Sequence, residues 1–403
     1  MIRLALRNVL RHKGRTLMTL AAIVAGVAGM ILSGGFIHDI FIQLGEAIIH
    51  SQSGHVQIAK AGFFAQGSRS PAKYFLGNPD AIRSAVAARP EVNDVMGRLE
   101  FSGLLNNGRT DLSIVGEGVV PDSEARLGTY LQITAGRQIA QRDTYGILLG
   151  EGVAHTLKLA PRDRATLVAN TVEGAANVLD FEVVGVFRSF SKDYDARAVR
   201  IPLAAAQELL GTRAVNTLVV SLLQTDDTDR VAEALRVQLG PETLEVMTWK
   251  ALDDFYDKTV QMYDRQFGVL QLIILAMVLL SVANTVNMAV FERVGEFGTM
   301  RALGNRGPQV FGLVLTESLM LGLLGSAIGV TVGILLALAI SAIGIPMPPP
   351  PNANQGYLAH IRIVPKVVAL AFAVGVSATL LAALVPAVRV ARMPVVTALR
   401  ANV

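Results

Sequence analysis

Apolar residues gather in four long runs along this chain, and the rest of the sequence is arranged around them. The runs are Leu17–Ile37, Phe267–Val290, Val310–Ile345 and Val367–Val388. Because a helix needs about 20 apolar residues to cross the hydrocarbon core of a bilayer, each run predicts a membrane span. Residues 50–248 show shorter apolar stretches separated by turn residues, which is typical of a folded soluble domain.

Composition agrees with several spans and one sizeable soluble domain. Of the 403 residues, 52% are hydrophobic, and the mean hydropathy of +0.46 is too apolar for an ordinary soluble protein. Cysteine is absent, so neither a disulfide framework nor a cysteine metal site is expected. The soluble domain must therefore depend on its own core.

Basic residues set the expected orientation of the spans. They occur before the first run (Arg3, Arg7, Arg11, Lys13, Arg15), in the loop before the third (Arg293, Arg301, Arg306) and in the tail (Arg389, Arg392, Arg400). The loop before the fourth run has only Arg362. Since basic loops stay in the cytoplasm, both termini are predicted to be cytoplasmic and the soluble domain extracytoplasmic. A cleaved signal peptide is the alternative, but the first run is too long and Gly45-Glu46-Ala47 is a poor cleavage site.

These patterns predict an α-helical membrane protein with four transmembrane helices and an α+β extracytoplasmic domain between the first and second. The predicted segments are a cytoplasmic amphipathic helix (1–16), a first transmembrane helix and stalk (17–49), the extracytoplasmic domain (50–248), a stalk and second transmembrane helix (249–291), a charged cytoplasmic loop (292–308), a third transmembrane helix (309–345), an outer Pro-rich loop (346–364), a fourth transmembrane helix (365–388) and a cytoplasmic tail (389–403).

The soluble domain is predicted to mix strands and helices. Strands are expected at 54–59, 92–105, 111–118, 147–150, 181–187 and 218–223, and helices at 81–88, 203–210 and 228–239, with another starting near Glu151. Asn106-Asn107-Gly108, between two of the strands, is a hairpin signal. We therefore expect an α+β domain in two lobes.

Two amphipathic helices are expected to join this domain to the membrane. In the first, Phe36, Ile40, Leu44 and Ile48 recur at every fourth position. Trp249–Arg265 has helical spacing as well and continues into the second span, so the pair predicts a stiff two-helix stalk. His38 and Asp39 could indicate a proton relay or a metal site, but a solvated helix face is favoured because no third ligand is in register.

The sequence shows no motif that indicates catalysis. There is no GxSxG, HExxH or Walker A motif, so no catalytic, cofactor-binding or metal-ligating residues are proposed, and no nucleic-acid partner is expected. His50, His55 and His155 are too scattered to form a defensible site. The acidic cluster Asp226, Asp227 and Asp229 could bind calcium, but a helix N-terminus favours acidic residues in any case.

Small and ionisable residues mark the third span. Gly322, Gly325, Gly329 and Gly333 fall on nearly one helix face and predict close contact with a neighbouring helix. Glu317 lies within the span near its cytoplasmic end; a buried carboxylate is costly at mid-membrane and less so near the interface. A structural pair with a basic residue is favoured over a role in transport.

The charged stretch Phe291–Gly304 (FERVGEFGTMRALG) is the centre of the functional prediction. Glu292 and Glu296 are four apart, which is the spacing of one helix face. The pattern predicts a charged face opposite an apolar face of Val294, Phe297, Met300 and Leu303, and it predicts that Gly304 ends the helix. The stretch is interpreted either as a solvated loop or as a small docking helix that receives force from a cytoplasmic partner.

This stretch resembles the cytoplasmic loop of FtsX-like ABC permeases, the class that includes MacB and the LolC/LolE lipoprotein-releasing subunits. The residues that carry the resemblance are Glu292, Arg293, Glu296, Phe297, Gly298, Arg301, Ala302, Leu303 and Gly304. In that family the loop is the coupling helix that contacts the ATPase, so the resemblance implies this role for these residues. Phe297 stands where an aliphatic residue is commoner, and Asn305-Arg306-Gly307 replaces a turn of small residues.

The soluble domain resembles the extracytoplasmic core domain of MacB-like permeases. The matching phrases are Ile114-Val115-Gly116, Thr134-Ala135-Gly136-Arg137, Leu149-Gly150-Glu151-Gly152-Val153-Ala154, Val183-Val184-Gly185-Val186-Phe187 and Ile201-Pro202-Leu203. Each is short, and each is also explained by a turn after a β-branched run.

The family resemblance implies a non-catalytic subunit that transmits movement across the membrane. Since the chain has no P-loop, ATP and Mg are expected to be bound by a separate ABC ATPase dimer, which implies two permease chains, identical or related. ATP-driven closure of the ATPases would push the loop and move the second span and stalk as one lever. The expected location is the bacterial inner membrane, in contact with membrane lipid.

Substrate and partners beyond the ATPase are not determined by the sequence. Release of lipoproteins or lipids is favoured, with a lipoprotein substrate or a periplasmic adaptor as a further partner. The alternatives are MacB-like efflux of drugs or peptides, and an FtsX-like transmembrane regulator of a cell-wall hydrolase. Homodimer and heterodimer both remain open.

Overall fold

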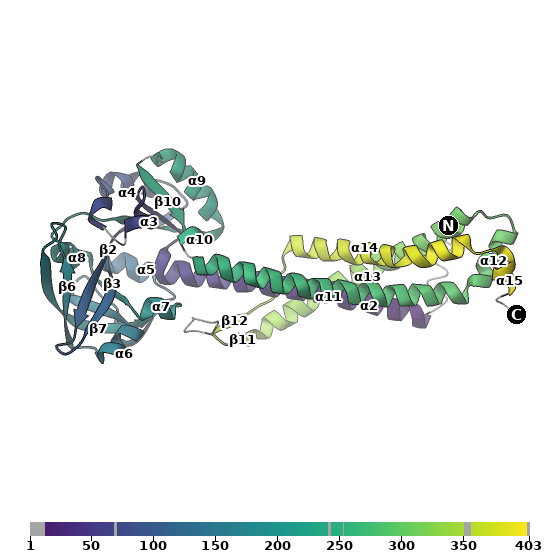
Figure 1. Ribbon diagram of the computed structural model, residues 1–403, viewed down its shortest axis with the longest axis horizontal. Helices are drawn as coiled ribbons and strands as arrows, with labels where there is room; N and C mark the ends of the chain where they lie inside the picture. The colour runs from purple at the N-terminus through teal and green to yellow at the C-terminus, as the bar shows by residue number, and fades with distance from the viewer. Residues whose placement is uncertain (1–12, 68–70, 241–242, 253, 350–355, 401–403) are drawn as a thin grey trace. The chain divides into compact units, whose positions relative to one another are not determined.

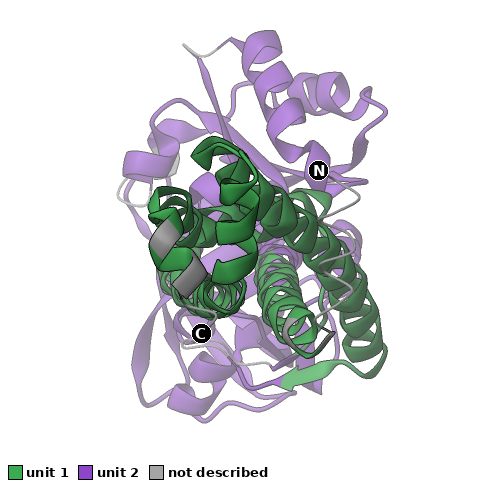
Figure 2. Cartoon of the chain, turned by 90° about the vertical axis from the view of Figure 1, so that its right-hand side faces the viewer, with its two compact units in different colours: residues 1–41, 259–346, 358–403 green, residues 42–258, 347–357 purple. Residues whose placement is uncertain are grey.

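A computed structural model describes residues 13–67, 71–240, 243–252, 254–349 and 356–400. The chain divides into two compact units, which Figure 2 shows in separate colours. Unit 1 comprises residues 1–41, 259–346 and 358–403, and unit 2 comprises residues 42–258 and 347–357. Most of the predicted N-terminal amphipathic helix (1–12 of 1–16) lies outside the described residues.

Unit 1 is built mainly from long apolar helices. Its elements are α2 (Lys13–Ile48), α11 (Asp254–Glu292), α12 (Val294–Ala302), α13 (Gly307–Ile343), α14 (Pro365–Arg392) and α15 (Val395–Arg400). The short strands β11 (Ile345–Met347) and β12 (Tyr357–Ala359) each have two residues in unit 1 and one in unit 2. Helices α2 and α11 run on into residues of unit 2. Helices α2, α11, α13 and α14 are long and apolar enough to cross a membrane, in agreement with the four predicted spans.

Glycines allow two of these helices to pack closely, as the sequence predicted. A Cβ atom on Gly329 would lie 2.8 Å from the Val27 Cβ of α2, and one on Gly325 would lie 3.0 Å from Ile23. Real Cβ atoms rarely approach so closely, so only glycine fits at this contact without a shift. The glycine stripe of α13 therefore sets its distance from α2.

Unit 2 is a mixed α/β fold (Figure 1). Its strands are β1 (Val56–Lys60), β2 (Val92–Asn106), β3 (Asp111–Val119), β4 (Gln132–Gly136), β5 (Gly146–Gly150), β6 (Arg164–Asn170), β7 (Ala176–Arg188), β8 (Ala198–Pro202), β9 (Thr217–Leu222) and β10 (Leu244–Thr248). Its helices are η1 (Ile49–Ser53), α3 (Phe63–Gln66), η3 (Pro71–Tyr74), α4 (Pro79–Ala87), α5 (Pro121–Leu127), α6 (Glu151–Leu157), α7 (Lys192–Asp195), α8 (Leu203–Leu210), η4 (Thr225–Asp227), α9 (Thr228–Leu239) and α10 (Trp249–Leu252).

The strands form one sheet with two parts, and the long strand β2 contributes to both of them. The order is β10-β1-β9-β2-β3-β8-β5-β7-β4, and β6 pairs with β2 and β7. The first part of β2 pairs with β9, and its last part pairs with β3 and β6. The β2–β3 pairing is antiparallel and closes at Asn106 and Asp111, so the hairpin predicted from Asn106-Asn107-Gly108 is confirmed.

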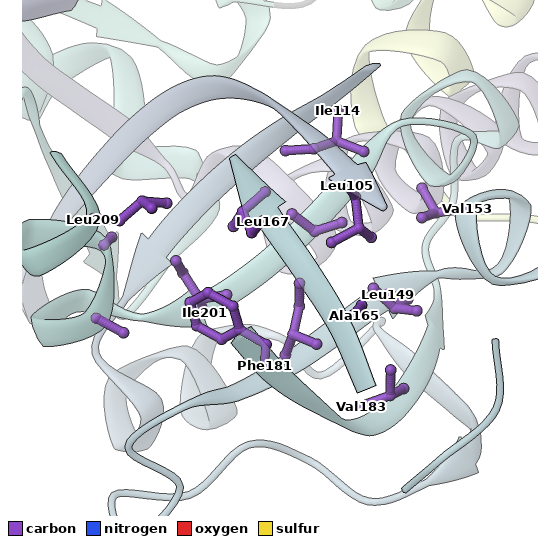
Figure 3. Close-up of a cluster of buried hydrophobic side chains, with 14 of the residues drawn as sticks. Leu105, Ile114, Leu149, Val153, Ala165, Leu167, Phe181, Val183, Ile201 and Leu209 are labelled. Atoms are coloured by element: carbon purple, nitrogen blue, oxygen red, sulfur yellow. The ribbon is translucent and has the colours of Figure 1, made fainter. Parts of the chain in front are cut away.

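Two buried clusters fill the two parts of this sheet, in agreement with the expected lobes. Figure 3 shows the larger cluster, to which Leu105, Leu149, Leu167, Phe181 and Ile201 contribute from five different strands. Each of these side chains is at most 1% exposed. Burying one such side chain contributes about 1.5–3 kcal/mol, so the core itself stabilises a unit that contains no disulfide.

The sequence analysis did not predict some of the strands, notably β8. Its residues Ala198–Pro202 are all buried, although Arg200 interrupts the apolar run. Arg200 is 0% exposed because carboxylates inside the unit pair with it. A strand that buries an ion pair does not show the apolar pattern from which strands are recognised.

The expectation of a solvated face for His38 and Asp39 was wrong for Asp39. His38 is exposed, but Asp39 is only 1% exposed. Its carboxylate accepts from Arg362 Nε at 2.8 Å and from the His360 backbone N–H at 2.8 Å. Asp39 therefore anchors the segment that leads into α14, a partner far away in the sequence.

Candidate functional site

Helix α12 is a short helix set off from α11 by one residue. α11 ends at Glu292, Arg293 has φ −104° and ψ 11°, and α12 begins at Val294. At the other end Leu303 is the C-cap, and Gly304 takes a φ of +102°, which glycine adopts without strain. The prediction that Gly304 ends the helix is confirmed.

Arg293 turns toward α13 and is buried. Its Nη1 donates to Glu317 Oε2 at 2.6 Å and its Nη2 to Glu317 Oε1 at 3.3 Å, while its Nε donates to Glu296 at 3.0 Å. The guanidinium also lies 5.1 Å from the centre of the Phe297 ring. Burial opposes the charge, but the hydrogen bonds to Glu317 and Glu296 outweigh it and raise the pKa of Arg293. The predicted basic partner of Glu317 is thus confirmed.

Arg301 fastens the other end of α12 to the end of α14. Its Nη1 donates to the Met393 carbonyl at 2.5 Å and to the Ala391 carbonyl at 3.4 Å. These acceptors are backbone atoms that follow the fourth span, and sequence reasoning did not anticipate them because any residue type supplies a carbonyl. Together, Arg293 and Arg301 tie α12 to both α13 and α14.

The nine predicted coupling residues do not share one environment. Glu292, Glu296, Ala302, Leu303 and Gly304 are exposed, Arg301 is intermediate, and Arg293, Phe297 and Gly298 are buried. A partner can touch the exposed residues and part of Arg301 directly, but not the three buried ones. The role of all nine in contacting an ATPase stays a prediction.

The predicted apolar face of α12 was partly wrong, since Leu303 is 83% exposed. Val294 and Phe297 are buried, as expected. An α-helix turns about 100° per residue, so each step of three falls about 60° short of a full turn. Three such steps from Val294 carry Leu303 to the opposite side. Glu296, Thr299 and Leu303 are instead exposed at helical spacing, and together with the exposed Glu292 at the end of α11 we call them the outward stripe.

Two histidines that the sequence analysis considered scattered meet in unit 2. The rings of His50 and His55 are 5.7 Å apart. His55 Nδ1 accepts from the Leu222 N–H at 3.2 Å, and its Nε2 lies 3.2 Å from the Thr225 hydroxyl, which donates to Glu46. Burial lowers the pKa of His55 to about 4, so this ring is a neutral structural group at pH 7.

Within the described part of the chain, no group of three or more His, Asp or Glu residues could hold a metal ion. Two members of the acidic cluster considered for calcium form ion pairs. Asp227 pairs with Arg230 at 2.8 Å, and Asp229 pairs with Lys250 at 3.0 Å. These carboxylates stabilise the start of α9 and its connection to α10.

Four long apolar helices and a large mixed α/β unit define a multi-span membrane protein that carries a folded domain. Two family models match the sequence: the MacB-like periplasmic core domain over residues 16–238 and the FtsX-like permease C-terminal region over residues 268–395. Because the first match covers more than half of the chain, this chain belongs to the ABC transporter permeases with a MacB-like core domain and an FtsX-like permease region. The resemblance inferred from the loop motif is confirmed.

Relatives of similar sequence come from distant organisms. An uncharacterized ABC transporter permease of Methanocaldococcus jannaschii is 27% identical and covers 51% of each chain. LolE of the lipoprotein-releasing system of Haemophilus influenzae is 21% identical, over 64% of this chain and 63% of that protein. The uncharacterized permease YvrN of Bacillus subtilis is 23% identical, over 99% of this chain and 98% of that protein. The chain thus matches under two thirds of the first two relatives and nearly all of the third.

Solved domains are similar to part of the chain. The periplasmic region of MacB from Actinobacillus actinomycetemcomitans matches with a TM-score of 0.36 and 15% identity, over 53% of this chain and 95% of that one. The extracellular domain of the transporter YknZ from Gram-positive bacteria matches with a TM-score of 0.35 and 15% identity, over 48% of this chain and 100% of that domain.

Proposed function

We propose that this permease transmits movement from a separate ATPase subunit through the outward stripe of α12. The observation that carries the proposal is that Leu303 is 83% exposed, in a segment that also exposes the acids Glu292 and Glu296. When a partner covers a large exposed apolar side chain, the free energy of the complex falls because apolar surface is removed from water. The neighbouring carboxylates suit a partner that presents basic groups around an apolar pocket.

The inward side of α12 provides a path for the movement. Arg293 connects the helix to Glu317 of α13, and Arg301 connects it to backbone carbonyls at the end of α14. A displacement of α12 therefore acts on two span helices at once, while α11 precedes it by a single residue. In this mechanism ATP and Mg are bound by the ATPase dimer, and two permease chains work together.

Orientation follows from the charge of the loops. We place both termini and α12 in the cytoplasm and unit 2 in the periplasm, with the spans in the inner membrane, because the basic residues cluster in the N-terminal segment, the α12 loop and the tail. Unit 2 then acts on substrate outside the inner membrane, in contact with lipid.

Release of lipoproteins or lipids is the substrate class that we favour. LolE and LolC, from lipoprotein-releasing systems, align over 64% and 80% of this chain. Efflux is the second candidate, since MacB of Chlorobium luteolum, a macrolide export ATP-binding/permease protein, aligns over 82% of this chain but only 51% of its own length. Copurified lipid or lipoprotein supports release, whereas a copurified cell-wall hydrolase supports the regulatory alternative.

Replacing Leu303 tests the outward stripe. In Leu303→Glu, an exposed side chain with no role in the core of α12 gains a negative charge at the proposed contact. We expect at least a tenfold loss of ATPase subunit recovered with the purified permease, and loss of substrate-stimulated ATP hydrolysis. Leu223→Glu is the matched control, because Leu223 of unit 2 is 66% exposed and receives the same charge. Equal ATPase recovery with both variants would contradict the proposed contact.

A further inference from the structure

Unit 2 contains a cavity of about 530 Å³. The proposed coupling function assigns no role to it. Residues of η1, β2, β3 and α7 line it. Its volume lies within the range of roughly 300–1,000 Å³ that is usual for ligand pockets. One wall is the π-helix η1, a conformation that is rare in proteins and frequent at functional sites.

A buried charge cluster of Arg98, Arg200, Glu117 and Glu124 stands beside the cavity, and each of these residues is at most 5% exposed. Arg98 Nη2 pairs with Glu124 at 3.1 Å, and Arg200 pairs with Glu117 at 3.1 Å and with Glu124 at 2.8 Å. Two positive and two negative charges cancel. The arginines also donate to the Gln52 carbonyl at 2.7 Å and the Ser51 carbonyl at 2.9 Å, which holds η1 in place.

Glu100 is a further acidic residue whose charge is not cancelled within this cluster. Its backbone pairs with Asn216, but its carboxylate, which lines the cavity, has no hydrogen bond or ion pair to any residue that the structure describes. Among the exposed lining residues, Asp193 and Arg197 carry opposite charges that offset each other. Arg98, which also lines the cavity, has a buried Nε with no acceptor among the described residues. The site therefore has one uncompensated carboxylate and one unused donor.

The remaining wall combines uncharged polar side chains of Ser51, Gln52, Ser53, Gln57 and Ser191 with apolar ones. Ile48, Phe64, Val115, Phe190 and Leu252 line the cavity together with the polar groups. We propose that this cavity binds a cationic amphiphile, with an ammonium or guanidinium group on the Glu100 carboxylate and an apolar body against these side chains. Such a ligand would touch both Ile48 at the end of α2 and Leu252 of α10, the segments by which the chain enters and leaves the domain.

Protonation of Glu100 gives the site a pH dependence. Burial, with a contribution from the charge of Glu117, raises the pKa of Glu100 to about 7 against the opposing charge of Arg98. The other ionisable groups that line the cavity are Asp193 and Tyr194 of α7 and the neighbouring Arg197. A cation binds to the ionised carboxylate only, so affinity rises as pH rises through about 7.

Calorimetry with the full chain in lipid nanodiscs tests the site without any ATPase. The probes are 4-phenylbutylamine, which is a cation at pH 8, and 4-phenylbutanol, which has the same apolar body without the charge. We expect the amine to bind at least roughly tenfold more tightly than the alcohol, as for a charge-assisted hydrogen bond. We also expect its affinity to fall by roughly tenfold between pH 8 and pH 6, as Glu100 gains its proton.

Variants assign the effect to one carboxylate. Glu100→Gln should bind amine and alcohol equally, whereas Glu173→Gln, which removes an exposed carboxylate elsewhere on unit 2, should keep the preference. Size-exclusion chromatography and circular dichroism establish that both variants fold. Equal binding of the two probes by the unaltered chain, binding of neither, or a preference that persists in Glu100→Gln would each overturn the proposal. Because no ATPase is present, these outcomes are independent of the coupling proposal.

Discussion

The ion pair between Arg293 and Glu317 is expected to hold α12 against α13, and Glu317→Gln tests this. The substitution keeps the size of the side chain but removes its charge. Among the described residues, Glu296 is then the remaining carboxylate partner of Arg293, and its side chain is 49% exposed, compared with 13% for Glu317. The arginine is left buried with its stronger partner gone.

The size of the effect follows from this burial. Removing one partner of a buried ion pair costs about 3–5 kcal/mol, because the remaining charge is uncompensated. Since Glu296 stays within 3.0 Å of the Arg293 Nε, we expect a value at the lower end, about 3 kcal/mol. At a factor of ten for every 1.4 kcal/mol, that is on the order of a 100-fold change in the local opening equilibrium.

Hydrogen exchange measured by mass spectrometry reports this opening directly. In nanodiscs, amides of Val294–Ala302 should exchange on the order of 100-fold faster in Glu317→Gln than in the unaltered chain. Arg392→Gln is the control, because Arg392 is exposed and lies nearby in unit 1. The exchanged pair Arg293→Glu with Glu317→Arg should recover part of the protection. Unchanged exchange of α12 in Glu317→Gln would refute the reasoning.

Two further predictions concern packing and pH. Gly329→Ala should lower the thermal midpoint of helix unfolding, because its Cβ would lie 2.8 Å from the Val27 Cβ, whereas Gly312→Ala on the same helix meets nothing within 4 Å and should not. For Glu100, the folded-state pKa of about 7 exceeds the ordinary 4.5, so the folded state loses stability as pH rises from about 4.5 to about 7. Glu100→Gln should therefore be more stable than the unaltered chain at pH 8, by up to about 3 kcal/mol at 1.36 kcal/mol per unit of pKa, and equally stable at pH 4.5. A difference that does not vary with pH, measured by denaturant unfolding, would contradict this.

The sequence by itself determined the features that depend on local pattern. Runs of apolar residues predicted the four long helices, turn residues predicted the β2–β3 hairpin, and the loop motif led to the family. The glycine stripe of α13 predicted close packing, although not that α2 is the neighbour. These signals are readable because each arises from residues close together in the chain.

Tertiary structure alone decided how the charges are used. Asp39 is buried against Arg362 where a solvated helix face was expected, Arg301 binds carbonyls near Met393, and Arg98 and Arg200 share Glu117 and Glu124 inside unit 2. The free energy of a charge depends on its partners and on its distance from water, and both are set by segments far apart in the sequence. Local pattern therefore predicts most of the elements, while long-range pairing determines which of their polar residues are buried and which remain exposed.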